Sequence, residues 1–284
     1  MEPESRTFTS QRLCIRYVVW GDEANEPLVL VHGGRDHARS WDFVVERLVD
    51  RYCCYCIDLR GHGDSDWSVG SQYSLPEFVA DVTALLDHLG RDPLSLVGHS
   101  LGGAVVLQVA GVLPDRVKKV CAIEGWGPKI IERTPAHLRM RRWLEQLEEF
   151  ADRQPRRYAS LEEAARRMRE ENSFLSPGLA MHLTVHGARR NEDGSYSWKF
   201  DNYVRMHSPY EFNIDDARVI WNQFRCPTLL VRGDKSWAAD PEEDGKASAF
   251  HNYRSVLVRD AGHWVHHDQL DEFTRLLRAF LDEE

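Results

Sequence analysis

The sequence predicts an α/β protein in which a mostly parallel central sheet is flanked by helices and carries a helical lid. Short apolar runs alternate with helical patterns along most of the 284 residues. One of these runs ends in a glycine-flanked serine, Ser100, just before a helical pattern begins. The alternation stops in the middle of the chain and later resumes. Strands and helices that alternate in this way form parallel pairs with right-handed crossovers.

The strands are expected at short runs that consist mainly of apolar residues. In order along the chain they cover residues 14–20, 28–31, 52–57, 94–97, 120–123, 228–231 and 255–258. Helical patterns lie between them, and we expect helices at residues 41–49, 75–89, 104–113 and 269–281. The spacing of apolar positions separates the two kinds of element.

The middle of the chain has a different character. Residues 125–214 are charged, rich in helical patterns and poor in strands. We expect them to form a helical cap over the carboxyl ends of the strands, while residues 1–124 and 215–284 form the core domain. The turn at residues 191–194 and the stretch 195–200 are expected to add a short extended piece. The mixed charges of this region predict solvated helix faces rather than a binding patch.

Composition excludes several classes of function. The net charge of −9 argues against a nucleic-acid partner, because phosphate binding requires a basic face. No apolar run approaches the ~20 residues that cross a bilayer, so we expect no membrane partner. The first residues lack the basic and apolar regions of a signal peptide. The six cysteines are expected to be buried thiols rather than disulfides. These features predict a cytoplasmic protein, and they leave its oligomeric state open, with a homo-oligomer as one alternative.

The segment from Gly98 to Gly102 carries the strongest chemical signal. It reads G-x-S-x-G at the point where a strand gives way to a helix. A turn this tight brings backbone atoms close together, which requires residues without a Cβ at Gly98 and Gly102. Ser100 is then exposed at a helix N-terminus, where free amides and the helix dipole favour negative charge. The pattern predicts a nucleophilic serine.

Four motifs in a fixed order produce a family resemblance. They are His32-Gly33-Gly34 after one strand, residues 58–65 after the next, the Ser100 turn, and Gly262-His263 near the C-terminus. Together they resemble the α/β-hydrolase fold, and in particular its serine hydrolases of the carboxylesterase type. The resemblance covers the chain outside the cap. It implies that His263 is the base and that the amides of Gly34 and Leu101 form the oxyanion hole.

The position of the acid is less direct. Many members of the family place an aspartate three residues beyond the glycine that ends the strand after the cap, and here that residue is Ser236. A second arrangement in the family places the acid after the strand that follows the Ser100 helix, and here that residue is Glu124. Burial of a charged carboxylate at the end of an apolar strand costs free energy unless the carboxylate is paired. This favours Glu124 as the acid, with Asp234 as the alternative.

Tryptophans lie beside the predicted site loops. Trp41, Trp126, Trp237 and Trp264 are expected to form an aromatic pocket for an apolar acyl or alcohol group. Other residues of the motifs have structural interpretations: Asp58 and Arg60 are expected to fix the loop below the site through hydrogen bonds and a local ion pair.

The histidines near the C-terminus do not predict a metal site. His263, His266 and His267 lack an accompanying ligand pattern such as H-E-x-x-H, so no metal and no cofactor is expected. We expect His266 and His267 to be exposed or to face the cap.

The resulting hypothesis is a serine hydrolase that cleaves carboxylic esters of small to medium apolar substrates through an acyl-enzyme intermediate. A lactonase and a meta-cleavage-type carbon–carbon bond hydrolase are alternatives, because the family uses the same residues for both. A non-catalytic binding protein of this fold is a third. The serine argues against a dehalogenase or epoxide hydrolase, since those members of the family have a carboxylate at this position.

Overall fold

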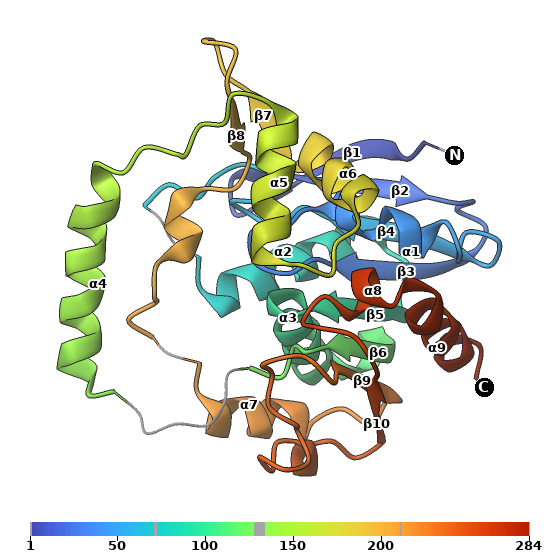
Figure 1. The fold of residues 1–284 in the computed structure, drawn as a ribbon. Coiled ribbons are helices and arrows are strands. Elements are labelled where there is room, and N and C mark those ends of the chain that lie inside the picture. Colours follow the sequence, from blue (N-terminus) through green and yellow to red (C-terminus); the bar gives the residue numbers. More distant parts are fainter. Residues whose placement is uncertain (1, 71–72, 128–133, 211, 284) are drawn as a thin grey trace.

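The computed structural model describes residues 2–70, 73–127, 134–210 and 212–283 (Figure 1). The strands of the main sheet are β1 (Glu4–Ser10), β2 (Leu13–Trp20), β3 (Glu26–Val31), β4 (Tyr52–Ile57), β5 (Leu94–His99), β6 (Val117–Ile123), β9 (Thr228–Gly233) and β10 (Tyr253–Val258). The helices that flank it are α1 (Asp42–Val45), α2 (Leu75–Leu89), α3 (Leu101–Val112), α7 (Ile214–Trp221), α8 (Val265–Asp268) and α9 (Leu270–Asp282).

The described strands form an eight-stranded sheet in the order β1-β2-β4-β3-β5-β6-β9-β10. β1 and β2 pair antiparallel, and β2 pairs antiparallel with β4. The pairs from β4 to β10 are parallel. This sheet confirms the predicted fold class, and it brings the carboxyl ends of β3, β5, β6, β9 and β10 to one edge.

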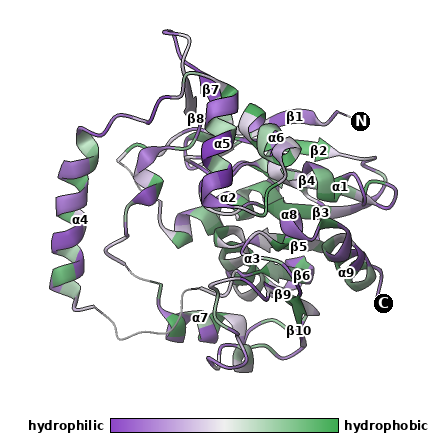
Figure 2. Cartoon of the chain, in the orientation of Figure 1, coloured by the Kyte–Doolittle hydropathy of each residue, from purple (hydrophilic) through white to green (hydrophobic). Residues whose placement is uncertain are grey.

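Alternating side chains divide the core into two layers. Along β3, Val29 and Val31 pack with the helices α2, α3 and α7, whereas Leu28 and Leu30 pack with α1 and α9 on the opposite face. All four side chains are fully buried, as expected for a parallel strand covered on both faces. Figure 2 shows the hydrophobic residues concentrated in α3 and the central strands.

Each strand expected from the sequence is present, but several elements differ from the prediction, and the helices α7 and α8 were not expected. β1 was not expected, because Glu4–Ser10 alternates exposed polar residues with buried ones and contains no apolar run. The helix expected at residues 41–49 is one turn, α1, preceded by the 3-10 turn η1 (Ala38–Trp41). Within the described residues the six cysteines are all free thiols, and four of them are buried.

The segment between β6 and α7 contains α4 (Ala136–Ala151), α5 (Leu161–Glu171), α6 (Pro177–Gly187), the hairpin of β7 (Ala188–Arg190) and β8 (Tyr196–Trp198), and the 3-10 turn η3 (Asn202–Arg205). In Figure 1, α5 and α6 lie side by side, while α4 stands at the outer edge of the molecule. We call the described part of residues 125–214 the cap. Each described helix is too short or too polar to cross a bilayer.

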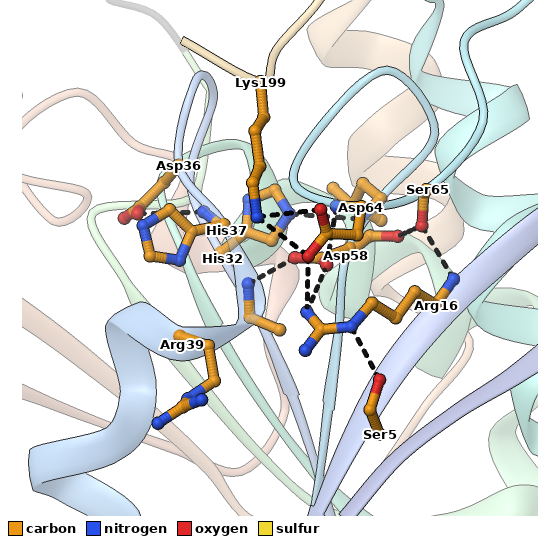
Figure 3. Close-up of polar contacts among 12 residues, drawn as sticks. Ser5, Arg16, His32, Asp36, His37, Arg39, Asp58, Asp64, Ser65 and Lys199 are labelled. Carbon is orange, nitrogen blue, oxygen red and sulfur yellow. Dashed lines mark hydrogen bonds and ion pairs between the residues drawn. The ribbon is translucent and has the colours of Figure 1, made fainter. Parts of the chain in front are cut away.

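A buried carboxylate organises the loops at the carboxyl ends of β3 and β4 (Figure 3). Asp58 accepts hydrogen bonds from the amides of Ala38 (2.6 Å) and Asp64 (3.0 Å) and pairs with Arg16 (2.9 Å). Burial alone would raise the pKa of Asp58, but the Arg16 charge and the amide hydrogen bonds outweigh it and lower this pKa. Arg60 forms an ion pair with Asp81 at 2.7 Å, so the two residues that the motif singles out pair with different partners.

Buried histidines make the fold sensitive to acid. Burial lowers the pKa of His32 to about 4 and that of His62 to about 3, and it lowers those of His99 and His266 well below the ordinary value. These side chains are neutral in the folded protein, whereas the unfolded chain binds a proton at each of them below about pH 6.5.

We therefore expect the free energy of unfolding to be constant above about pH 7 and to fall as the pH drops from about 6.5 to 4. Each buried histidine contributes up to ~1.4 kcal/mol per pH unit. Burial raises the pKa of Asp36 to about 7 and that of Asp268 to about 6. Protonation of these two carboxyl groups therefore stabilises the folded state as the pH falls, which opposes the effect of the histidines. Urea unfolding at a series of pH values measures the slope. A stability that does not change from about pH 6.5 to 5 would contradict this prediction.

Candidate active site

Ser100 lies at the turn between β5 and α3 in a strained backbone conformation. Its φ of 51° and ψ of −112° are outside the regions that residues with a Cβ normally adopt. A Cβ on Gly98 would clash with the backbone of Gly102, and a Cβ on Gly102 would clash with the carbonyl oxygen of Val31. Glycine is therefore required on both sides of the serine, as the motif predicts. The Ser100 side chain is half-buried at the N-terminus of α3.

Glu124 and His263 are joined by a short hydrogen bond. Glu124 follows the last residue of β6 and has a φ of 50°. Its side chain is inaccessible to solvent. His263 lies in the loop between β10 and α8, and its Nδ1 donates to Glu124 Oε2 at 2.5 Å. This fixes the ring orientation and leaves Nε2 as the nitrogen that can accept a proton.

Two further donors hold the Glu124 carboxylate. The amide of Gly233 donates to Oε1 at 2.9 Å, and the hydroxyl of Ser236 donates to Oε2 at 2.5 Å. A buried carboxylate with three hydrogen bonds is satisfied and rigid. Ser236 occupies the position where many members of the family have their acid, and here its hydroxyl group contacts the Glu124 carboxylate.

Asp234, the alternative acid, has other partners. It pairs with Lys235 at 3.2 Å and accepts a hydrogen bond from the amide of Ala261 at 3.4 Å. Both contacts are typical of a carboxylate that stabilises a turn.

Two contacts bring the serine turn close to the other site loops. The amide of Ser100 donates to the carbonyl oxygen of Ile123, the residue before Glu124, at 2.8 Å. The side chain of His99 donates from Nε2 to the carbonyl oxygen of His263 at 2.9 Å. Among the described residues, no hydrogen bond joins the Ser100 hydroxyl to His263. Contacts of this kind often tighten only when substrate is bound.

The amides of Gly34 and Leu101 are available as donors. Neither donates a hydrogen bond to another described residue. Leu101 is the first residue of α3, where a helix has no internal acceptor for the amide. Gly34 is exposed, and a Cβ built there would have no atom within 4 Å. A substrate oxygen could therefore approach both amides closely.

The four tryptophans expected around the site have different positions. Trp41 and Trp126 are buried, 0% and 1% exposed, and belong to the two core layers rather than to a pocket. Trp237 is 76% exposed, with its ring centre 4.6 Å from that of His263. Trp264 meets His263 edge to face at 5.2 Å. Only Trp264 lines the cavity described next, within the part of the chain that the structure describes.

A cavity of ≈ 280 Å³ lies between the cap and the core. Gly34 and Trp264 contribute to its wall from the core side. In the sequence, Gly34 precedes the charged residue Arg35, and Trp264 follows the candidate catalytic residue His263. The cap contributes apolar side chains and arginines. The described apolar lining residues include Met168, Leu175, Leu183, Trp198 and Phe200.

Of the two remaining C-terminal histidines, His267 faces the cap as expected, whereas His266 neither is exposed nor lines the cavity. His266 is completely buried, and its ring stacks on that of Trp41 at 4.6 Å. Its burial follows from the short helix α8, which turns it toward α9 and the core. His267 is partly buried and lines the cavity beside the cap.

One group of described side chains has metal-ligand geometry. Asp42 of α1 lies close to His182 and His186, which are one turn apart on α6. However, Arg39 donates to Asp42 Oδ2 at 2.6 Å, so a cation bound there would have to compete with its guanidinium group. His182 Nε2 lies 3.1 Å from Asp42 Oδ2, a contact that joins the cap to the core.

Comparison with known proteins identifies the family. A family model described as alpha/beta hydrolase fold matches residues 26–270. The serine hydrolase-like protein of Danio rerio is 26% identical, with 94% of this chain and 85% of that protein covered. Epoxide hydrolase 4 of Mus musculus is 24% identical (96% and 77% covered), and the esterase YbfF of Escherichia coli is 25% identical (91% and 94% covered). The chain belongs to the alpha/beta hydrolase fold family, and it is a hydrolase that acts on a small molecule.

Sequence reasoning missed two residues of this site, His99 and Ser236. Both lie beside residues that the motifs single out, but their roles depend on contacts with distant segments. The role of Ser236 could have been predicted from its position. It stands where many members of the family have their acid, and a hydroxyl group there can donate a hydrogen bond near the loop that contains His263.

The contact between Gly103 and Gly125 provides a test of this geometry. A Cβ on Gly125, the residue after Glu124, would clash with the backbone of Gly103 in the first turn of α3. We expect Gly125→Ala to lower the free energy of unfolding by about 1–3 kcal/mol or more, since backbone must move. Gly178→Ala is the matched control: the space around Gly178 in α6 is open, and alanine favours a helix. Equal stability of both variants in urea unfolding would disprove the close packing.

Proposed function

We propose that this hydrolase cleaves carboxylic esters with Ser100 as nucleophile, His263 as base and Glu124 as the acid that orients His263. The observation that supports it most is the 2.5 Å hydrogen bond between His263 Nδ1 and Glu124. A buried carboxylate in this position selects the tautomer with a free Nε2 and stabilises the imidazolium that forms during attack.

The proposed reaction has two halves. His263 Nε2 takes the Ser100 proton while the serine oxygen attacks the ester carbonyl, and the amides of Gly34 and Leu101 stabilise the oxyanion. The tetrahedral intermediate expels the alcohol, which receives the proton from His263. Water then gives a proton to His263 and attacks the acyl-enzyme. The second tetrahedral intermediate releases the carboxylic acid, and His263 returns its proton to the Ser100 oxygen.

The cap is proposed to act as a lid that selects substrates. Residues 125–214 would form this lid over the core of residues 1–124 and 215–284. The cavity between the two parts supports this division, because its wall combines Gly34 and Trp264 with side chains of α5, α6 and η3. A lactone or a carbon–carbon substrate would use the same three residues, and a screen with both classes beside esters separates these alternatives.

Labelling with a fluorophosphonate tests the nucleophile directly. We expect the protein to react stoichiometrically at Ser100 and to hydrolyse p-nitrophenyl esters, and we expect Ser100→Ala to lose both properties while it keeps its fold. Mass spectrometry of the labelled peptide locates the adduct. A folded protein that is neither labelled nor active would support a binding function instead.

The two candidate acids are separated by neutral substitutions. We expect Glu124→Gln to lower kcat by up to ~10⁴-fold, because an amide no longer selects the correct tautomer of His263. Asp234→Asn should stay near the wild-type rate, since Asp234 only stabilises a turn. Steady-state kinetics with one p-nitrophenyl ester compares the variants, and circular dichroism checks their folds. The reverse order of the two effects would assign the acid to Asp234.

A further inference from the structure

Arginine side chains dominate the polar part of the cavity between the cap and the core. Two carboxyl groups, those of Asp36 and Glu171, also line it. Burial raises the pKa of Asp36 to about 7, so its negative charge is only partial near neutral pH. The described arginines that line the cavity are Arg35, Arg153, Arg156, Arg167 and Arg205.

Three of these arginines have no acidic partner. Arg35, Arg156 and Arg205 form no ion pair with a carboxylate among the described residues. Arg157, by contrast, is not among the residues that line the cavity, and it pairs with Asp193 at 2.6 Å. The cavity wall therefore carries three arginine charges that no described carboxylate neutralises through an ion pair.

Arg205 lies near other charges of the cavity wall. Burial lowers its pKa and the nearby charges of Arg35 and Arg153 lower it further, while the Glu171 charge opposes them. Like charges that gather in this way destabilise the protein unless an anion neutralises them. Arg35 is also strained, with a φ of 66°. Strain in a residue with a Cβ often occurs where side chains are placed for binding.

Aromatic rings position two of the arginines without using their hydrogen-bond donors. Arg205 lies over the ring of Phe200 at 5.0 Å, and Arg156 lies over the ring of Tyr158 at 5.4 Å. A guanidinium group that stacks through its face keeps its N–H edge free for the oxygens of a carboxylate or phosphate.

Other donors in the wall also lack acceptors. Asn172 is only 6% exposed, and its side chain lies beside the Asp268 carboxyl group without a well-formed hydrogen bond from its amide nitrogen. Arg167 Nε is buried without a partner as well. In a cavity wall, donors of this kind are available to the oxygens of a ligand.

We infer that this cavity binds an anionic group of the substrate, a carboxylate or a phosphate, through Arg35, Arg156 and Arg205. The inference rests on the ester hydrolysis proposed above and adds the substrate class: an ester whose acyl or alcohol part carries such a group. Gly34, the proposed oxyanion donor, lines the same cavity and directly precedes Arg35. The apolar lining residues would contact the carbon chain between the ester and the anion.

Binding is measured first, independently of catalysis. Isothermal titration of the Ser100→Ala protein with succinate and with inorganic phosphate tests for an anion site even if Ser100 is not the nucleophile. We expect at least one of them to bind, and the tighter one identifies the anion. The double variant Arg35→Gln/Arg205→Gln in this background should bind about tenfold or more weakly. Arg157→Gln is the control and should bind like its parent. Equal binding by all three proteins, or no binding of either anion, would overturn the inference.

Kinetics then connects the site with turnover. The wild-type protein should hydrolyse mono-p-nitrophenyl succinate with a higher kcat/KM than the methyl ester of the same compound. Arg156→Gln and Arg205→Gln should each lower this ratio about tenfold, mainly through KM for the acid. A preference for the methyl ester in the wild type, or a ratio that is the same in every variant, would contradict an anionic substrate. Loss of all hydrolysis together with intact anion binding would instead disprove the ester hydrolysis.

Discussion

The hydrogen bond between Glu124 and His263 is the contact on which the rest of the site depends. It joins the end of β6 to the loop after β10, two segments separated by the whole cap in the sequence. Because Glu124 is buried, its charge is tolerable only with the donors that surround it. Ser236 and the Gly233 amide supply the remaining donors, and the end of β9 is thereby tied to the same carboxylate. His99 adds a connection from β5 to the His263 backbone. The ends of four parallel strands thus converge on one carboxylate–imidazole pair.

The sequence predicted this arrangement where local chemistry is decisive. Residues 75–89 were expected as a helix and coincide with α2, whose start is marked by the capping box of Ser74 and Glu77. The strained serine turn followed from Gly98 and Gly102, which sit where no Cβ fits. The placement of Glu124 next to His263 was implied by the family resemblance and supported by the cost of an unpaired carboxylate at the end of an apolar strand. In each case a few adjacent residues contain the physical reason.

The sequence was less informative where distant segments meet. β1 lacks an apolar run because it is an edge strand, and β2 supplies its pairing. Trp41 and Trp126 were expected in a pocket because they adjoin the site loops, but the sheet places them in its two core layers. The cavity is assembled from the loop after β3, the cap and the α8 region, so its arginines are scattered along the chain. For this reason the sequence predicted an apolar substrate pocket, whereas the folded chain has a cavity lined by arginines. In the sequence each of these charges is expected to be solvated, and only the fold brings them to one cavity wall.

The proton in the Glu124–His263 hydrogen bond can be observed directly by one-dimensional proton NMR in water. The account predicts a far-downfield resonance from His263 Nδ1–H that disappears in His263→Ala and in Glu124→Gln and persists in Asp234→Asn. A resonance that survives the loss of the Glu124 charge but vanishes in Asp234→Asn would show that the imidazole is held by a different carboxylate, and the proposed site would have to be abandoned.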